Sequence, residues 1–512
     1  MATKVLISAL LVLGTAIRAA MLSLPMAKLS SLFLIDDSFI TFDIARSIAR
    51  GHGPAAAGRL TNGFQPLWAL LASLPYRILG DATLTDLRPS DSAVRLVLVL
   101  GVLCDLALIG AILLALARRF GVRSPALVLA ASYWALSPRA CGNALNGMET
   151  VLVLALFHVA WGWLDELSKS AGLTKWQGVI TGAMLAMLLL SRVDQAIAVG
   201  LFVLLCGSRF RNRGFALSAA SAFLLPILLW SVWIQRWTGH VYPVSGEASR
   251  LQSIPSPEFL PRVAFHLRVF WLNVMGPSRW LLLIALVLTV MAIAFRGFEE
   301  TARAGRTLVF HAGTCLATAA AYIIYQGGCW YFPRYLALFD WTVLLWAAIA
   351  VNLLVGEDAL RRRVAGFGAV ALCMLMMFSH PILERLTAVE VAAAQPKGYR
   401  AVAVWARKSF APGSVVGAVQ SGALGYYATT LKVVNLDGVV NVDALQAIRA
   451  RRLIAYALGE GVQFVLGPYS NLKFVMDQES DPALVRRMRI VGVGPTDGFV
   501  NAPWLVSVLF RF

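Results

Sequence analysis

The stretch LIDDSFITFDIARSIARGHG, residues 34–53, places two adjacent aspartates and two arginines directly after the first long apolar segment of the chain. The rest of the sequence is much more apolar, because 59% of its 512 residues are hydrophobic and only 14% are charged. Soluble domains usually carry about 25% charged residues. The composition therefore predicts a polytopic α-helical membrane protein, with residues 34–53 outside the hydrocarbon region.

About eleven segments are long and apolar enough to be read as membrane spans, which need roughly 20 residues each. The first segment could also be a cleaved signal peptide with Lys4 at its basic end, but its apolar run extends to Leu24, which favours an uncleaved span. The predicted spans are 5–24, 93–117, 125–142, 149–164, 176–191, 195–208, 214–235, 280–296, 308–325, 336–355 and 364–382.

The basic residues of the connecting loops predict the orientation, since lysine and arginine in short loops mark the cytoplasmic side. With Lys4 inside, the predicted inner loops contain clusters at 118–123, 169–175, 209–213, 296–306 and 361–363. This alternation places residues 25–92, 236–279 and everything after about 383 outside the cytoplasm. The net charge of +18 is spread over these loops, which indicates contact with anionic lipid and no nucleic-acid partner.

Two of the predicted outer parts have a pattern of their own. PLWALLASLPYRILG, residues 66–80, is apolar but too short to span easily, so we expect an interfacial or re-entrant helix within the outer loop 25–92, with a true span as the alternative. In the tail, the β-type runs 414–428, 431–441 and 462–471 alternate with the helical stretch 443–461. The sequence thus predicts a transmembrane domain, residues 1–383, followed by a small extracytoplasmic α/β domain, residues 384–512.

Charged, amide and aromatic side chains concentrate at this predicted outer face. If residues 38–50 are helical, Asp36 and Asp37 lie at the N-terminal end of the helix and Arg46 lies on one face with Asp43. Each candidate alone could be a cap, an ion pair or an interface anchor. Together they suit sugar transfer from a lipid phosphate, with arginines for the phosphate, amides and aromatics for the sugar, and an aspartate as base. The further candidates are Asn62, Gln65, Glu149, Arg192, Asp194, Tyr242, Glu247, Trp330 and Arg334.

These residues resemble a known family. DDSFITFDIARSIARGHG is similar to the first outer loop of the GT-C glycosyltransferases, polytopic enzymes that use polyprenyl-phosphate sugars. TNGFQPLW, NGMET, SRVD, YPVSG and VNLDGVVN resemble, in the same order, segments of a bacterial branch that includes arabinofuranosyl- and mannosyltransferases. The resemblance implies an inverting transferase in the bacterial cytoplasmic membrane, with a polyprenyl-phosphate-linked sugar as donor and an envelope glycan, glycolipid or protein as acceptor on the outer face.

The same resemblance implies roles for individual residues. Asp36 or Asp37 would be the general base, and a divalent cation such as Mg²⁺, Mn²⁺ or Ca²⁺ could assist it. Arg46 matches the arginine of the family motif, and His52 matches the variable position of its G-x-G end. Arg334 resembles a basic residue that would meet the donor phosphate, while Cys329 stands where many relatives have an acid.

The main alternative function is a transporter or flippase of lipid-linked intermediates, which would need ionisable groups near the middle of the membrane. Asp105 is the clearest such residue, although a helix–helix hydrogen bond is the simpler explanation for it. Weaker examples are His158, His311 and Asp340. A non-enzymatic membrane scaffold is a third alternative. Finally, Cys141 and Cys329 fall near span ends on the same predicted side, where a disulfide could join them.

Overall fold

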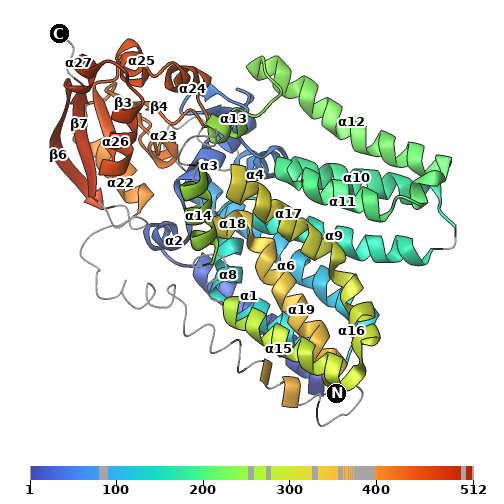
Figure 1. Cartoon of the computed structure of the whole chain (residues 1–512). Helices are drawn as coiled ribbons and strands as arrows, with labels where there is room; N and C mark the ends of the chain where they lie inside the picture. Colours follow the sequence, from blue (N-terminus) through green and yellow to red (C-terminus); the bar gives the residue numbers. More distant parts are fainter. Residues whose placement is uncertain are drawn as a thin grey trace.

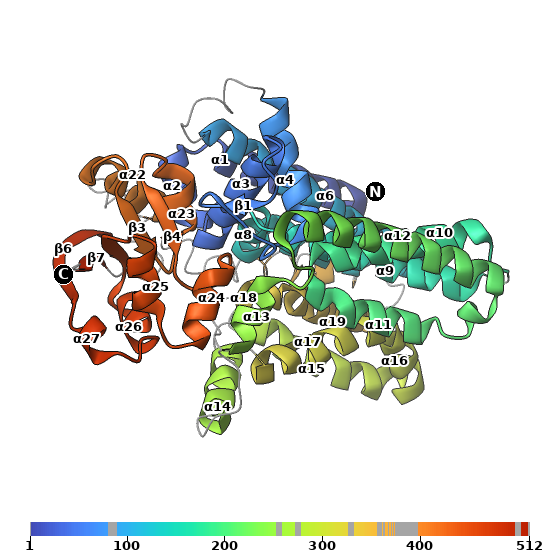
Figure 2. The same ribbon diagram turned by 90° about the horizontal axis from the view of Figure 1, so that it is seen from above.

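The chain forms a bundle of helices with an α/β region at one end, which Figure 1 shows at the upper left. The computed structural model describes residues 2–79, 90–170, 172–251, 259–271, 278–325, 332–355, 398–496 and 503–509, together with eight positions between 361 and 373. Seen from above, the α/β region lies to one side of the bundle (Figure 2), beside the helices that follow the first span.

Five helices within the described ranges are long and apolar enough to cross a membrane. They are α1 (Ala2–Leu22), α6 (Asp91–Phe120), α9 (Thr150–Lys169), α12 (Arg213–Thr238) and α19 (Ala337–Val355). Shorter apolar helices are α7 (Pro125–Leu136), α10 (Lys175–Ser191), α11 (Ala196–Leu205), α15 (Ser278–Arg296) and α17 (Val309–Tyr325). These ten helices lie where ten of the spans are predicted. Most of the predicted span 364–382 falls outside the described residues.

The predicted span 125–142 is broken in the structure, because α7 ends at Leu136 and a separate helix, α8 (Pro138–Leu145), follows. Ser137 is extended and its side chain accepts a hydrogen bond from the backbone N–H of Ala140. Pro138 disfavours a helical conformation at Ser137 and lacks an N–H to continue α7, so the serine starts a new helix instead.

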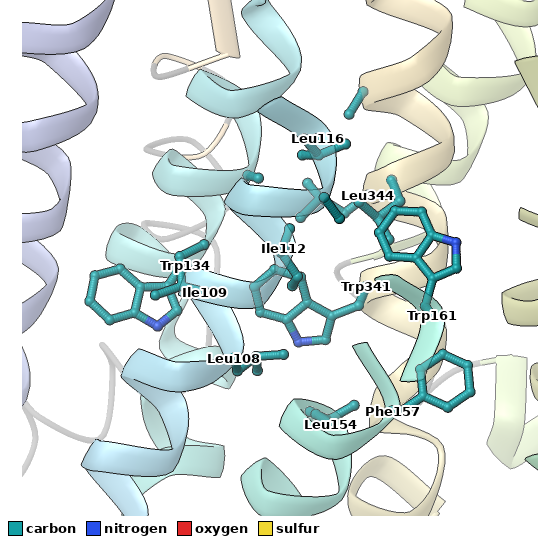
Figure 3. Close-up of a cluster of buried hydrophobic side chains, with 14 of the residues drawn as sticks. Leu108, Ile109, Ile112, Leu116, Trp134, Leu154, Phe157, Trp161, Trp341 and Leu344 are labelled. Atoms are coloured by element: carbon teal, nitrogen blue, oxygen red, sulfur yellow. The ribbon is translucent and has the colours of Figure 1, made fainter. Parts of the chain in front are cut away.

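The bundle core is built from bulky side chains of α6, α7, α9 and α19. Figure 3 shows Leu108, Ile112 and Leu116 of α6 facing Trp341 and Leu344 of α19, with Trp161 beside them. All of these side chains are buried. Burial of large apolar groups between helices fixes the relative positions of these four elements.

A buried ion pair crosses the same part of the bundle. Arg18 Nε of α1 donates to Asp105 Oδ2 of α6 at 2.5 Å, and Trp134 Nε1 donates to the same oxygen at 2.7 Å. The guanidinium also stacks on the Trp134 ring at 4.0 Å. Likewise, Asp340 accepts from Arg139 at 2.9 Å. The acids that the transporter alternative would use are therefore engaged by neighbouring helices.

Helices α10 and α12 pack unusually closely. Gly178 and Gly182 of α10 face α12, where an added Cβ atom would collide with the carbonyl oxygens of Phe215 and Ala219. Glycines four residues apart let two helix backbones approach, as in many membrane helix pairs. The sequence GVITG thus explains why α12, which is mostly exposed elsewhere, is held against the bundle.

The outer loop contains short elements that carry the aspartate pair. These are α2 (Met26–Phe33), α3 (Asp36–Ala49), β1 (Ala55–Ala56), β2 (Arg59–Leu60) and α4 (Pro66–Ile78). The helix predicted over 66–80 is thus present as α4, and its buried Trp68, Ala72 and Tyr76 form one face against α3 and α6. The second predicted outer loop contains α13 (Val244–Leu251) and α14 (Phe259–Val269). Short helices α16 (Phe298–Gly305) and α18 (Phe332–Tyr335) flank α17.

The C-terminal region contains a five-stranded sheet in the order β4-β3-β5-β7-β6. Strands β3 (Val415–Ala418), β4 (Lys432–Asn435) and β5 (Phe464–Gly467) are parallel and correspond to the three predicted β-type runs. An antiparallel ribbon of β6 (Met488–Thr496) and β7 (Pro503–Leu509) completes it. The surrounding helices are α22 (Tyr399–Ser409), α23 (Gly422–Tyr427), α24 (Val442–Arg449), α25 (Leu453–Gly459), α26 (Tyr469–Asp477) and α27 (Pro482–Val485). The predicted α/β fold of the tail is confirmed.

Candidate active site

Asp36 fastens the outer loop to the C-terminal region. Its Oδ2 accepts a hydrogen bond from the backbone N–H of Gly422 at 2.9 Å, and its Oδ1 accepts one from Ala423 at 3.0 Å. Both donors belong to the first turn of α23, where N–H groups have no partner within the helix. Only glycine fits at position 422, because a Cβ atom there would collide with the Asp36 carbonyl oxygen. Asp36 is 7% exposed and its two oxygens are occupied.

Asp37 has a different environment, although it is the next residue. Its side chain is 46% exposed and accepts a hydrogen bond from Arg334 Nη2 at 3.0 Å. The Arg334 side chain is only 9% exposed, and its Nε and Nη1 atoms are buried with no hydrogen-bond partner among the described residues. A buried guanidinium that keeps unused donors is prepared to bind an anion.

A second arginine, Arg192, also lies against the Tyr335 ring. The Tyr335 ring is 4.6 Å from the guanidinium carbon of Arg334 and 4.3 Å from that of Arg192. Arg192 Nε donates to Asp194 Oδ1 at 3.0 Å, and the hydroxyl of Tyr322 donates to Asp194 Oδ2 at 2.8 Å. Cation–π contact and this ion pair hold the second guanidinium at a fixed place.

Glu149 lies beside these arginines at the start of α9. It is 1% exposed, and within the described part of the chain neither of its carboxylate oxygens has a hydrogen-bond partner. Arg192 Nε is 4.0 Å from Glu149 Oε1. A small cavity of about 20 Å³ nearby is lined by Arg192, Gln195 and Arg334. A space of that size accommodates about one water molecule, which would bridge such groups.

A larger cavity of about 310 Å³ opens next to the arginines. The loop before α13 and the start of α4 form one wall, with Tyr242 exposed to 63% and the Gln65 Oε1 atom buried without a partner in the described structure. The cavity is also lined by Arg192, Asp194, Tyr322 and Tyr335. The cavity therefore combines a guanidinium, an amide oxygen and several aromatic rings.

The structure brings several of the predicted site residues together. Gln65, Arg192, Asp194 and Tyr242 line the 310 Å³ cavity. Arg334, which donates to Asp37, also donates to the hydroxyl of Tyr335, and Tyr335 lines the cavity. Glu149 is not among the residues that line this cavity, but it lies 4.0 Å from Arg192. Asn62 does not line the cavity but fixes the loop before α13, which does. Its side-chain amide donates to the carbonyls of His240 and Tyr242 and accepts from the N–H of Val244.

Other predicted site residues lie elsewhere. Arg46 is buried, donates to Asp43 Oδ1 at 2.5 Å and stacks on the Tyr426 ring at 4.5 Å, which favours a structural role over phosphate binding. Glu247 pairs with Arg449 of α24 on the surface. His52 is exposed at the end of α3. Trp330 lies outside the described residues, as does Cys329, and Cys141 is a buried free thiol.

Sequence reasoning missed three residues of this region. Tyr322 and Tyr335 organise the arginines, and Asp437, in the loop after β4, is close enough to Asp37 for the two carboxylates to interact electrostatically. Tyr335 directly follows Arg334, so the FPRY segment contained a usable signal. Asp437 lies in VNLDGVVN, one of the segments that resemble the family, so it too had a usable signal. Tyr322 lies within an apolar span, where only the fold reveals its position.

Two buried carboxyls predict how stability depends on pH. Burial raises the pKa of Asp36 to about 7 and that of Asp437 to about 7, although backbone hydrogen bonds oppose the rise in both cases. Between about pH 4 and pH 7 the folded protein then binds protons that the unfolded chain has released, so the free energy of unfolding decreases as pH rises through this window.

We therefore expect a lower thermal midpoint at about pH 8 than at about pH 5 for the purified protein in detergent, with no further decrease well above the raised pKa. Asp437→Asn removes one titrating group and should reduce the difference. The exposed carboxyl of Asp477 provides a control variant, Asp477→Asn, that should leave it unchanged. A midpoint that rises with pH would contradict the assignment.

Three of the candidate carboxylates are already engaged, whereas the two Glu149 oxygens have no partner among the described residues, so the divalent cation that the family resemblance implies stays a prediction. A site for such a cation needs several oxygens free to face one ion, but Asp36 is saturated by backbone amides, Asp37 is paired with Arg334, and Asp194 is paired with Arg192. No group of three His, Cys, Asp or Glu side chains suited to a metal is found in the ranges that the structure describes. No step below is therefore assigned to a metal.

Comparison with known families gives a match in the tail. A domain of unknown function (DUF8728) matches residues 388–497, which covers most of the α/β region and names no activity. No curated protein matches the chain.

Comparison with solved structures extends over nearly the whole chain. ArnT from Cupriavidus metallidurans bound to undecaprenyl phosphate aligns with a TM-score of 0.55 and 12% identity, over 97% of both chains. The Archaeoglobus fulgidus oligosaccharyltransferase in complex with zinc and sulfate aligns with a TM-score of 0.53 and 13% identity, over 89% of this chain and 67% of its own. The chain thus shares the fold of these structures, and its helical membrane bundle with a C-terminal α/β region is the fold class that the sequence predicts.

Proposed function

We propose that this protein is an inverting glycosyltransferase that moves a pentose or hexose from a polyprenyl-phosphate carrier to an envelope glycan, glycolipid or protein. The observation that carries the proposal is the half-exposed Asp37 carboxylate held by a buried arginine, Arg334, whose remaining nitrogens have no partner among the described residues. The ArnT structure of the same fold is described as bound to undecaprenyl phosphate, which supports a lipid phosphate as donor.

In this proposal Asp37 is the general base. Its carboxylate takes the proton from an acceptor hydroxyl while the hydroxyl oxygen forms a bond to the anomeric carbon of the donor sugar. The bond between that carbon and the phosphate oxygen breaks on the opposite face, so the configuration inverts. The same carboxylate stabilises the positive charge that develops on the sugar ring. The unused N–H groups of Arg334 pair with the departing polyprenyl phosphate.

The neighbouring cavity is the proposed binding site for the sugar. Its volume of about 310 Å³ lies at the small end of ligand cavities, which suits one sugar residue rather than an oligosaccharide. Gln65 offers a free amide oxygen to a sugar hydroxyl, and the exposed Tyr242 ring offers a face to the C–H groups of the ring. Arg192, which also lines the cavity, sits where the phosphate and the sugar would join.

Orientation and domain organisation complete the proposal. The basic loops lie at the opposite end of the helices from Asp37, Glu149 and Arg192, and the positive-inside pattern therefore supports a site on the outer face of the cytoplasmic membrane. Residues 1–383 would form the catalytic membrane domain. Residues 384–512 would form an outer α/β domain that Asp36 holds beside the site.

The proposal is tested by measuring transfer of label from polyprenyl-phosphate sugars to native envelope extract. Purified wild-type protein should consume at least one donor. Arg334→Gln should raise the donor KM, because it removes the charge that binds the phosphate, whereas Lys473→Gln on the surface of α26 should not. If wild-type protein binds donors and moves them across vesicle bilayers without consuming any, the transporter alternative replaces this proposal.

A further inference from the structure

A second, larger cavity lies at the other end of the bundle from the carboxylates. It is an open groove of about 830 Å³ lined by the C-terminal half of α6, by α9 from Leu156 onward and by α10 from Gln177 to Met187. These three helices run side by side (Figure 1), and α9 contacts both of the others. Because Glu149 and Arg192 lie at the opposite ends of α9 and α10, the groove is separate from the proposed active site.

Small residues explain why this space is empty of protein. The bulky side chains Leu108, Ile112 and Leu116 of α6 point into the bundle core (Figure 3), so other residues of α6 face the groove. Gly110 of α6 and Gly162 of α9 line it, and a Cβ atom added at either glycine would meet no atom within 4 Å. The edges, at Leu114 and Val159, are exposed, so the groove opens sideways to the surrounding lipid.

The depth of the groove matches one leaflet of a bilayer. It extends along α6 from Ala107 to Arg118, which is about 16 Å at 1.5 Å per residue. Half of a hydrocarbon core of about 30 Å is about 15 Å. Apolar side chains line the deep part, while the charged residues of the groove gather at its mouth, so a lipid chain and its headgroup would find matching surroundings.

The mouth of the groove carries more positive than negative charge. Arg118 pairs with Glu166 at 3.0 Å, and Arg119 and Lys169 both pair with Asp165. Arg209 adds a further cation, because it donates to the carbonyl oxygens of Ser168 and Ser170 at this rim. Four cations thus face two acids.

One of these cations, Arg119, has a hydrogen-bond donor without a partner among the described residues. The Arg119 guanidinium stacks on the Trp161 ring at 4.5 Å and donates through Nη2 to Asp165. Its Nη1 atom is buried and has no hydrogen-bond partner in the part of the chain that is described. A phosphate oxygen is the acceptor that this position lacks, and guanidinium–phosphate hydrogen bonds are among the strong ones.

We propose that the groove binds an anionic phospholipid from the leaflet at the basic end of the bundle, with one acyl chain along Gly110 and Gly162 and its phosphate at Arg119. The inference is independent of the proposed glycosyl transfer, since none of the groove residues lines the carboxylate site. The bound lipid would act as a structural partner of α6, α9 and α10.

Native mass spectrometry of the purified full chain tests this proposal. Detergent-solubilised protein is titrated with phosphatidylglycerol or phosphatidylcholine of the same chain length, and the retained lipid is counted. We expect phosphatidylglycerol to be retained at concentrations about tenfold lower than phosphatidylcholine, and inorganic phosphate not to displace it. Gly162→Phe fills the part of the groove that would hold the acyl chain, and Arg119→Gln removes the headgroup contact. Each should weaken phosphatidylglycerol retention about tenfold.

A matched control is Gly200→Phe, on the exposed face of α11, where an added Cβ atom also meets nothing within 4 Å. It should retain phosphatidylglycerol as wild type does. If Gly162→Phe does not fold, Gly110→Leu replaces it as the variant that fills the groove. Equal retention of the two lipids, or unchanged phosphatidylglycerol retention in the groove-filling variants, would overturn the proposal.

Discussion

Asp37→Asn is expected to reduce sugar transfer by about 10²–10⁴-fold, the contribution of a well-placed general base. Asparagine has nearly the same shape and still offers Oδ1 to the Arg334 Nη2 atom that Asp37 now accepts from at 3.0 Å. It cannot take a proton from the acceptor hydroxyl. We therefore expect the turnover number to decrease while the KM for the lipid donor changes little, measured from initial rates with a labelled donor in excess over enzyme.

Asp36→Asn is the matched comparison, because it makes the same chemical change one residue away. Both oxygens of Asp36 are occupied by the N–H groups of α23, so this variant should lower the thermal midpoint, and the protein that remains folded should still turn over its donor. A variant pair with the opposite behaviour, in which Asp36→Asn removes the chemistry and Asp37→Asn does not, would identify Asp36 as the base.

Removal of one partner of the Arg18–Asp105 pair should have the largest effect on stability. Asp105→Leu leaves the Arg18 guanidinium buried without its carboxylate, and breaking such a pair costs about 3–5 kcal/mol. The double variant Arg18→Met/Asp105→Leu removes both charges and should be less damaging than either single variant. Thermal midpoints of the four proteins in detergent provide this comparison.

A related variant, Asp105→Asn, distinguishes a transporter from a glycosyltransferase. If Asp105 served a transported ion, Asp105→Asn would preserve folding and abolish movement of substrate. In the structure, Asp105 binds Arg18 and Trp134 instead, so loss of folded protein is the expected phenotype and sugar transfer by the surviving fraction should remain.

Much of the fold could be predicted because its signals are local. Apolar length and basic loops locate ten helices, and alternation of β-type runs with helices identifies the tail. The break at Pro138 was also readable, since a proline within a span interrupts the hydrogen-bond ladder. The ribbon of β6 and β7 was not predicted, because β6 contains two glycines and a proline that weaken a strand pattern.

The site was predictable in outline and not in detail. Sequence alone indicated that acids, arginines and aromatics share one face, and the structure places Gln65, Arg192, Asp194 and Tyr242 around one cavity. It could not separate Asp36 from Asp37, because the difference comes from α23, a helix 386 positions later in the chain. Arg46 and Glu247 have the same chemical groups as residues that bind a phosphate or a sugar. Only their tertiary contacts show that they form structural ion pairs, with Asp43 and Arg449.

The contact between Asp36 and Gly422 has a consequence for biosynthesis. Asp36 leaves the ribosome long before its partner, which emerges 386 residues later. Loop closure over such a distance happens only once α23 has been synthesised. A nascent chain that lacks α23 therefore holds the aspartate pair without the backbone amides that fix Asp36, and the arrangement around Asp37 forms only after α23 is made.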